Sequence, residues 1–219
     1  MPPERRYPLW DAPVRLMHWA LALCVPLAWA SAELGEMTLH AWIGYTVLCL
    51  VVTRIAWGFL GSPQARFADF LRGPRGVLDY LRTGRRATPG HSPLGALSAL
   101  ALWLLLLAQA ASGLFNSDGI FFDGPLYYAV DGAVADFLGS VHDAAFNVLL
   151  AFVALHLLAI AWYEYRGERL LGPMVRGAEP GRQGTGPAAP GGRALLLLLL
   201  TALALWVLIS LAPEPVTYW

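Results

Sequence analysis

The sequence has no lysine, only two cysteines and few charged residues of any kind. Charged residues make up 14% of the 219 positions, well below the roughly 25% of an ordinary soluble domain. Cys24 and Cys49 both lie inside apolar runs, and neither a CxxCH motif nor a CxxC pair occurs. Covalent haem attachment and a clustered Cys/His zinc site are therefore not expected. We interpret both cysteines as small apolar residues of the interior.

Long hydrophobic runs are what the sequence has in abundance. Five apolar spans are expected at about residues 16–32, 39–60, 94–115, 141–163 and 194–212. Each is close to the roughly 20 residues that a helix needs to cross a bilayer, which predicts an all-α membrane protein. No clean small-residue cleavage site follows the first span, so we expect that span to be retained as a helix.

The fifteen arginines fall on one side of these five spans. They form three groups: Arg5, Arg6 and Arg15; Arg54, Arg66, Arg72, Arg75, Arg82, Arg85 and Arg86; and Arg166, Arg169, Arg176, Arg182 and Arg193. The opposite side carries acidic residues: Glu33, Glu36, Asp118, Asp123, Asp131, Asp136 and Glu214. The positive-inside rule makes the arginine side cytoplasmic. The N-terminus is then expected in the cytoplasm and the C-terminus in the periplasm.

Two connections on the arginine side have sequence patterns that predict their local structure. In the first, Phe67, Phe70 and Leu71, and then Val77, Leu78 and Leu81, recur at helical spacing between arginines. This pattern predicts two short amphipathic helices lying on the membrane surface. The second, residues 177–193, is rich in glycine and proline and is expected to be a flexible linker. It would join residues 1–176 to a separate C-terminal span and tail at 194–219.

Four histidines take matched depths in this topology. His142 and His156 lie about 21 Å apart along one helix, and fourteen residues at about 100° each bring both rings to nearly the same stripe. His18 falls at the depth of His156 on the cytoplasmic side, and His40 falls at the depth of His142 on the periplasmic side. Two neutral imidazoles approaching one centre from different helices are typical of axial haem ligation. The alternatives are hydrogen-bonded core histidines, or another metal, which would require a tighter cluster of ligands.

Four further residues are candidates for weaker roles. Gly44 lies one turn after His40, where the missing side chain would admit a porphyrin or a neighbouring helix. Arg15 and Arg54 are candidate partners of haem propionates, and the alternative for both is a positively charged membrane anchor. His91 precedes a helix start at Ser92 and Pro93. It is either a candidate proton donor for a quinone or an ordinary loop histidine.

Several motifs together resemble a known family. The stretches YPLWDAPVRLMHWALAL, LHAWIGY, RIAWGFLGSPQARFADFLRGP, GHSPLGAL and VHDAAFNVLLAFVALH resemble the bacterial cytochrome b561 and Ni/Fe-hydrogenase b-type cytochromes, over about residues 7–176. The resemblance implies a four-helix transmembrane bundle with two non-covalent b haems. It also implies His18, His40, His142 and His156 as the axial ligands, and an iron-dependent respiratory-chain role in the bacterial inner membrane. The fifth span departs from the four-helix family core.

The combined expectation is a di-haem membrane cytochrome that carries electrons between the quinone pool and a periplasmic redox partner. That partner would be a c-type cytochrome or an oxidoreductase subunit, and FFDGP and RFADFLRGP resemble the c-type cytochrome branch. Residues 116–140, with four aspartates, are expected to form its docking surface or a cap over the periplasmic haem.

The quinone is a candidate second cofactor. The lipid bilayer is an expected partner, and nucleic acid is not an expected partner. Whether the chain is a carrier or a component of a quinone-linked oxidoreductase stays open. One alternative is a haem-bearing anchor of a hydrogenase-like or molybdenum enzyme, and another is a cofactor-free transporter or structural protein.

Overall fold

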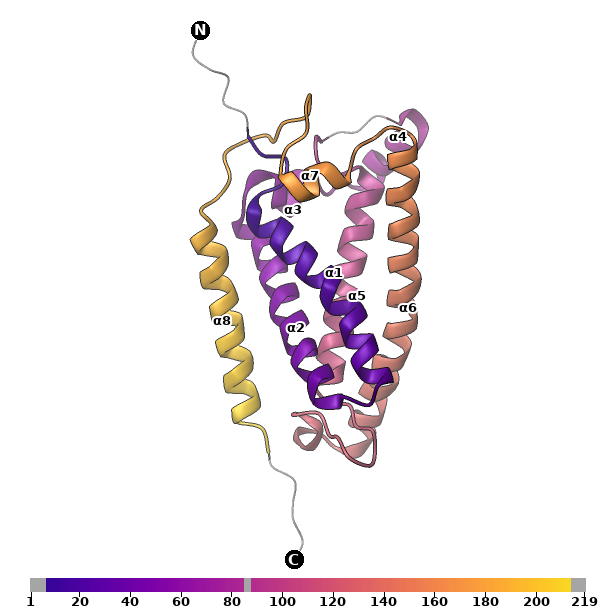
Figure 1. Ribbon diagram of the computed structural model, residues 1–219, viewed down its shortest axis with the longest axis vertical. Helices are drawn as coiled ribbons and strands as arrows, with labels where there is room; N and C mark the ends of the chain where they lie inside the picture. The colour runs from indigo at the N-terminus through magenta and orange to yellow at the C-terminus, as the bar shows by residue number, and fades with distance from the viewer. Residues whose placement is uncertain (1–6, 85–87, 214–219) are drawn as a thin grey trace, which may run out of the picture.

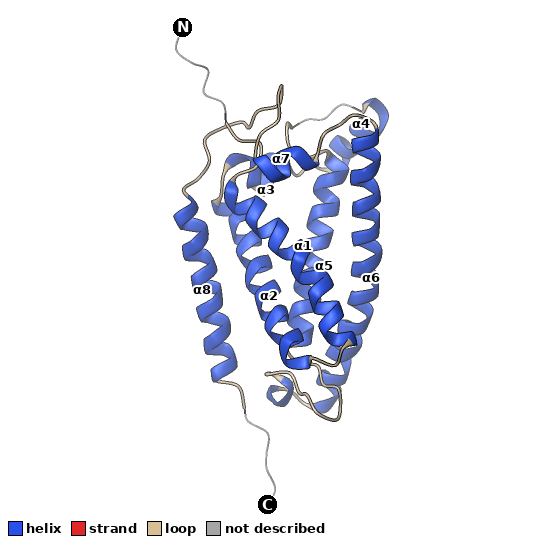
Figure 2. Ribbon diagram, in the orientation of Figure 1, coloured by secondary structure: helices blue, strands red, loops and turns tan. Residues whose placement is uncertain are grey.

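The computed structural model describes residues 7–84 and 88–213, and within these ranges the regular structure is helical (Figures 1 and 2). The α-helices are α1 (Ala12–Glu33), α2 (Met37–Leu60), α3 (Phe67–Phe70), α4 (Pro74–Thr83), α5 (Pro93–Gly113), α6 (Gly132–Tyr165), α7 (Leu171–Arg176) and α8 (Gly191–Ser210). Short 3-10 turns occur at Pro63–Ala65 and Tyr127–Ala129. Arg5, Arg6, Arg85, Arg86 and Glu214, which entered the charge pattern, lie outside the described residues.

Five helices, α1, α2, α5, α6 and α8, are long and apolar enough to cross a membrane, as the hydropathy pattern predicted. The largest difference is at α6, which begins at Gly132, nine residues before the predicted start at 141. Asp131 caps this helix by accepting the N–H of Val134 at 3.0 Å, and polar residues such as Asp136 extend it without interrupting it. Asp143 therefore lies well inside the helix.

Two other helix starts follow from their capping sequences. The side chain of Asp11 accepts the N–H of Val14 at 2.8 Å at the start of α1. The Ser92 hydroxyl accepts the N–H of Gly95 at 3.1 Å at the start of α5. Each cap satisfies a backbone donor that the first turn of a helix leaves open. The predicted cap at Ser92, with Pro93 in the first turn, is confirmed.

The long helices pack in chain order, with α1 against α2, α2 against α5, and α5 against α6. The principal partner of α6 is α5; neither α1 nor α2 packs extensively on it. In Figure 1 the connections that carry most of the arginines lie at one end of these helices, together with α3, α4 and α7. We call this the arginine end. The other end, with the α1–α2 turn and the α5–α6 connection, is called the acidic end.

Helix α8 lies against α2 (Figure 1). The hydroxyls of Thr53 and Thr201 are 3.0 Å apart across this contact, and Thr53 is buried. Hydrogen bonds between hydroxyls are a common link between membrane helices, where apolar side chains alone give little specificity. The fifth span is thus peripheral, but it has a defined place on the surface of α2.

The connection from α7 to α8 makes several hydrogen bonds to other segments of the chain. The Gly177 carbonyl accepts the N–H of Leu9 at 2.7 Å, and Gly184 donates its N–H to the Tyr7 carbonyl at 3.1 Å. Arg182 donates to the Pro89 and Gly90 carbonyls on the connection before α5. The segment therefore connects the chain before α1 with the start of α5, and its flexibility stays a prediction.

The two short helices predicted between the second and third spans are present as α3 and α4. The hydroxyls of Tyr80 on α4 and Tyr163 on α6 are 3.0 Å apart. Gly58 on α2 leaves room for the ring of Phe67 on α3, because a Cβ at that glycine would collide with the ring. At the arginine end, α4 is thus in contact with α6, and α3 is in contact with α2.

Candidate functional site

Four histidines meet in two pairs between α6 and the helices that precede it in the chain. His18 on α1 faces His156 on α6, with ring centroids 6.5 Å apart, near the arginine end. His40 on α2 faces His142 on α6, with ring centroids 6.2 Å apart, near the acidic end. All four side chains are half-buried. We call these the arginine-end pair and the acidic-end pair.

The separation within each pair matches one metal centre between two rings. A metal–imidazole bond is about 2.0 Å, and the ring centroid lies about 1.1 Å behind the nitrogen, so two opposed ligands would have centroids roughly 6.3 Å apart. Both measured separations lie close to this distance. The centroid separation in each pair is therefore compatible with one iron bound by both rings.

The acidic-end pair is held in one tautomer by backbone carbonyls. His40 Nδ1 lies 2.8 Å from the carbonyl oxygen of Ala28, and His142 Nδ1 lies 2.9 Å from that of Gln109. Because a carbonyl can only accept, Nδ1 carries the proton in both rings and donates it. Nε2 is left with a lone pair, which is the form that binds a metal.

Gln109 also contacts the free nitrogen of His142. Its side-chain Nε2 lies 3.0 Å from His142 Nε2, and the tautomer requires the amide to donate there. Its side-chain oxygen is buried and has no hydrogen-bond partner in the described part of the chain. The amide thus occupies the coordination position of His142, from which a metal ion would displace it.

The arginine-end pair has no comparable anchors within residues 7–84 and 88–213. Nδ1 of His18 is buried and makes no hydrogen bond, and no side-chain hydrogen bond involves His156. A buried nitrogen without a partner is costly, particularly between membrane helices. Such an orphaned nitrogen fits a site whose imidazoles are completed by a bound group.

Two glycines shape the space around the acidic-end pair. A Cβ at Gly44, one turn after His40, would meet no atom within 4 Å, so this position opens onto free space. A Cβ at Gly113 would lie 2.8 Å from Cε1 of His142, so only glycine allows that ring its position. The sequence pointed to Gly44 and missed Gly113, because nothing local relates Gly113 to a histidine twenty-nine residues later.

Arg15 lies near the arginine-end pair with part of its guanidinium available. Its Nη1 donates to the Val175 carbonyl at 2.6 Å, while its Nε is buried without a partner. Among the described residues, Nη1 of Arg15 thus donates to the protein and Nε has no acceptor. The role of Arg15 toward a haem propionate stays a prediction.

Arg54 does not extend to the membrane surface, as the alternative of a positively charged anchor would require, and its role toward a haem propionate stays a prediction. The side chain is only 3% exposed, and its guanidinium lies 4.1 Å from the ring centroid of Trp103 on α5. One nitrogen is 3.5 Å from the Ala65 carbonyl, and Nη2 is buried without a partner. The aromatic face takes the place of water around the cation, so Arg54 is part of the packed interior.

His91 lies in an aromatic corner at the arginine end. Its ring centroid is 4.6 Å from that of Trp10 and 4.6 Å from that of Phe70. Phe70 is buried and in turn contacts Trp103, whose ring lies under Arg54. His91 is therefore half-buried against aromatic rings, unlike an ordinary exposed loop histidine.

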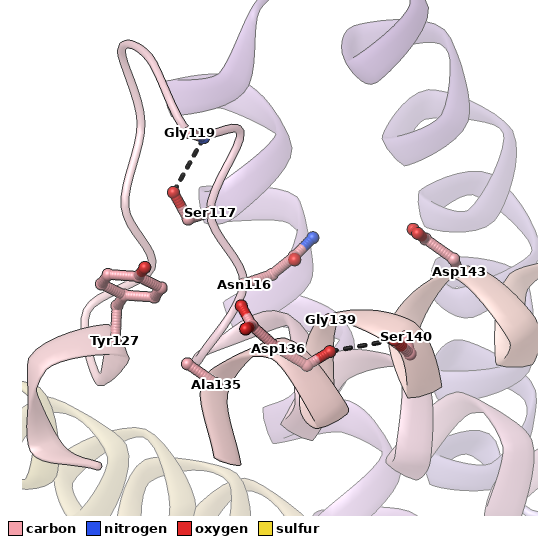
Figure 3. Close-up of a pocket in the computed structure, with 9 residues that line it drawn as sticks. All are labelled: Asn116, Ser117, Gly119, Tyr127, Ala135, Asp136, Gly139, Ser140 and Asp143. Atoms are coloured by element: carbon pink, nitrogen blue, oxygen red, sulfur yellow. Dashed lines mark hydrogen bonds between the residues drawn. The ribbon is translucent and has the colours of Figure 1, made fainter. Parts of the chain in front are cut away.

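The acidic end carries an open polar pocket of about 410 Å³. Figure 3 shows that its side chains come from the α5–α6 connection and the first half of α6, and that they include Asp136 and Asp143. Beside it, the carboxylate of Asp118 accepts the backbone N–H groups of Ile120, Phe122 and Phe121. These bonds hold the pKa of Asp118 below its usual range, so the loop keeps this negative charge in mildly acidic solution.

The chemistry of the donors fits haem better than a metal held by protein ligands alone. Within the described ranges, His, Cys, Asp and Glu side chains form no group of three or more that could hold a metal ion. A b haem requires only two protein ligands, because the porphyrin supplies the other four. The paired rings, the fixed tautomers of the acidic-end pair and the open space at Gly44 all fit that requirement.

Comparison with known proteins identifies the family. The family model described as prokaryotic cytochrome b561 matches residues 9–177, which is more than half of the chain and ends before the connection to α8. Searches of curated proteins and of solved structures found no match. The chain therefore belongs to the prokaryotic cytochrome b561 family, whose members are membrane b-type cytochromes that bind haem and transfer electrons.

Proposed function

We propose that this chain carries electrons across the bacterial inner membrane through two b haems, one at each histidine pair. Electrons would pass between the quinone pool at the arginine end and a redox protein at the acidic end. The arginine end would face the cytoplasm and the acidic end the periplasm, in accordance with the positive-inside rule. Residues 1–176 would form the haem-binding unit, with α8 as an accessory helix.

The observation that carries this proposal is the position of two histidines on one helix. His142 and His156 on α6 are about 21 Å apart along the helix axis. The ring centroid of each lies no more than 6.5 Å from the ring centroid of a histidine on another helix. One polar pair in a membrane interior could be a structural contact. Two pairs at successive depths along a single helix instead make a relay that spans most of the apolar layer.

Bound at these positions, haem would supply one-electron redox chemistry that no side chain provides. The protein would hold the acceptor nitrogens of His40 and His142 toward the iron through the Ala28 and Gln109 carbonyls. Gly44 would leave space for a porphyrin edge. The apolar helices would exclude water and so limit proton and oxygen side reactions.

Quinone exchange is proposed near His91. The ring lies between Trp10 and Phe70 at the arginine end, which is the end of the His18–His156 pair. Flat aromatic rings suit a quinone headgroup, and an imidazole can donate or accept the proton that accompanies quinone reduction or quinol oxidation. The packed surroundings of His91 support this role over that of a free loop histidine.

The acidic end is proposed as the docking surface for a redox protein. Asp118, Asp123, Asp131 and Asp136 lie on the α5–α6 connection and the start of α6. Negative charge on this scale steers a partner with a basic patch around its own redox centre. Phe121 and Ile120 are 93% and 78% exposed at the tip of the same loop, so a partner would also find apolar contacts there.

A haem measurement on the purified full-length chain tests the central proposal. We expect a reduced-minus-oxidised visible spectrum of b type, and two non-covalent haems per chain by extraction and quantification. A colourless preparation, or fewer than two haems per chain after saturation with haem, would contradict the assignment of four ligands. Stable co-purification with a large oxidoreductase would instead favour the haem-bearing anchor function.

Replacing His91 with alanine tests the quinone site. We expect the rate of haem reduction by a short-chain quinol to fall at least tenfold, while dithionite still reduces the full haem content. Leu94→Ala, on the exposed face of α5, is the control and should keep the original rate. A His91→Ala protein with an unchanged quinol-dependent rate would exclude His91 from the site.

A further inference from the structure

The two carbonyls that anchor the acidic-end pair share a second feature. Each accepts a hydrogen bond from a serine hydroxyl three residues further along its own helix. Ser31 Oγ donates to the Ala28 carbonyl at 2.9 Å. Ser112 Oγ lies 2.7 Å from the Ala108 carbonyl and 3.1 Å from the Gln109 carbonyl, so its single proton is shared between these two acceptors. Both serines are only 3% exposed. The same arrangement of histidine, carbonyl and serine thus occurs twice, on α1 with α2 and on α5 with α6.

A serine that bonds back to its own helix is common and by itself has no functional meaning. What distinguishes Ser31 and Ser112 is the other donor on the same oxygen, which is Nδ1 of a proposed iron ligand. Ser112 Oγ also lies 3.4 Å from Nδ1 of His142 itself. Among the described residues, no serine contacts either histidine of the arginine-end pair in this way.

We propose that Ser31 and Ser112 are positioning residues that tune the reduction potential of the acidic-end haem. The proposal rests on the proposed function, since it assumes that His40 and His142 bind iron. A hydrogen bond from Nδ1–H makes an axial imidazole a stronger electron donor, which favours the ferric state. A second donor on the same carbonyl shares its lone-pair density. The serines therefore weaken the histidine bond and hold this potential higher than it would otherwise be.

The test is a potentiometric titration of purified full-length protein with haem bound. For Ser31→Ala and Ser112→Ala we expect the midpoint potential of the acidic-end haem to fall in each variant, and further in the double variant. The potential of the arginine-end haem should stay unchanged. Single-haem proteins made by His40→Ala and by His156→Ala identify which transition belongs to which haem. Ser210→Ala is the matched control, because Ser210 also bonds back to its helix, at the Val207 carbonyl, but lies on α8.

A spectroscopic measurement separates tuning from a merely structural role. In protein labelled with ¹⁵N at histidine, the Nδ1–H resonances of the acidic-end ligands should shift toward stronger hydrogen bonding in both alanine variants. Threonine, which keeps the hydroxyl, should restore the original potential and resonances. Two bound haems with an unchanged or raised acidic-end potential would overturn the proposal and leave the proposed function intact. Fewer than two haems in the unsubstituted protein would refute the proposed function itself.

If an alanine variant fails to bind the acidic-end haem, cysteine at the same position decides the question. Cysteine has a similar size and a weaker donor than serine. A Ser112→Cys protein with both haems and a lowered acidic-end potential would support tuning by the hydroxyl. The same protein with the original potential would contradict it.

Discussion

Replacing His40 with alanine is expected to remove one haem, and replacing His156 with alanine is expected to remove the other. Each substitution deletes one of two protein ligands to a non-covalent b haem, and no other histidine lies opposite the partner that remains. Among the five histidines, His142 faces His40 and His18 faces His156 across the helices. Haem content should fall from two to one per chain in each variant, measured by extraction and pyridine haemochrome absorbance.

The number of haems that remain in double variants shows which two histidines bind the same haem. His40→Ala combined with His142→Ala removes both ligands of one site, so one haem should remain. His40→Ala combined with His156→Ala disables both sites, so none should remain. His91→Ala serves as the control histidine and should keep two haems. One residual haem in the His40/His156 double variant would mean that these two residues serve the same site, and the pairing would be wrong.

The pairing of the histidines could be predicted from the sequence because depth in a membrane follows from simple quantities. Hydropathy gives the spans, arginine asymmetry gives their direction, and a rise of about 1.5 Å per residue gives each histidine a depth. These quantities placed His40 with His142 and His18 with His156, and the structure brings the same residues together. Their role as iron ligands stays a prediction.

Other parts of the site depend on contacts that no local pattern encodes. Ser31 and Ser112 gain meaning only from a histidine on the next long helix, and a single serine in a helix carries no such signal. The burial of Arg54 was not foreseen, because an arginine near a span end usually extends to water, whereas here Trp103 covers it from α5. The start of α6 was misplaced because hydropathy detects the apolar part of a helix, and Asp131 extends the helix beyond it.

Gly44→Leu is a further substitution for which we expect the loss of a whole haem, here without removal of an iron ligand. The position lies one helical turn after His40, on the same face, and its missing side chain opens onto space without protein atoms within 4 Å. A leucine there should not collide with the protein. It would project into the space that we assign to the porphyrin beside His40. We therefore expect haem content to fall from two per chain to about one, with the arginine-end haem retained.

The fold should tolerate this substitution, which makes the haem measurement interpretable. Glycine inside a helix costs about 1 kcal/mol relative to good helix formers such as leucine, so the helix itself should gain stability. Gly192→Leu is the matched control, because Gly192 is also helical and also opens onto free space, but it lies at the start of α8. This control should keep two haems. If Gly44→Leu also bound two haems with unchanged potentials, the space beside Gly44 would belong to lipid or to helix packing, and the porphyrin would have to lie on another side of His40.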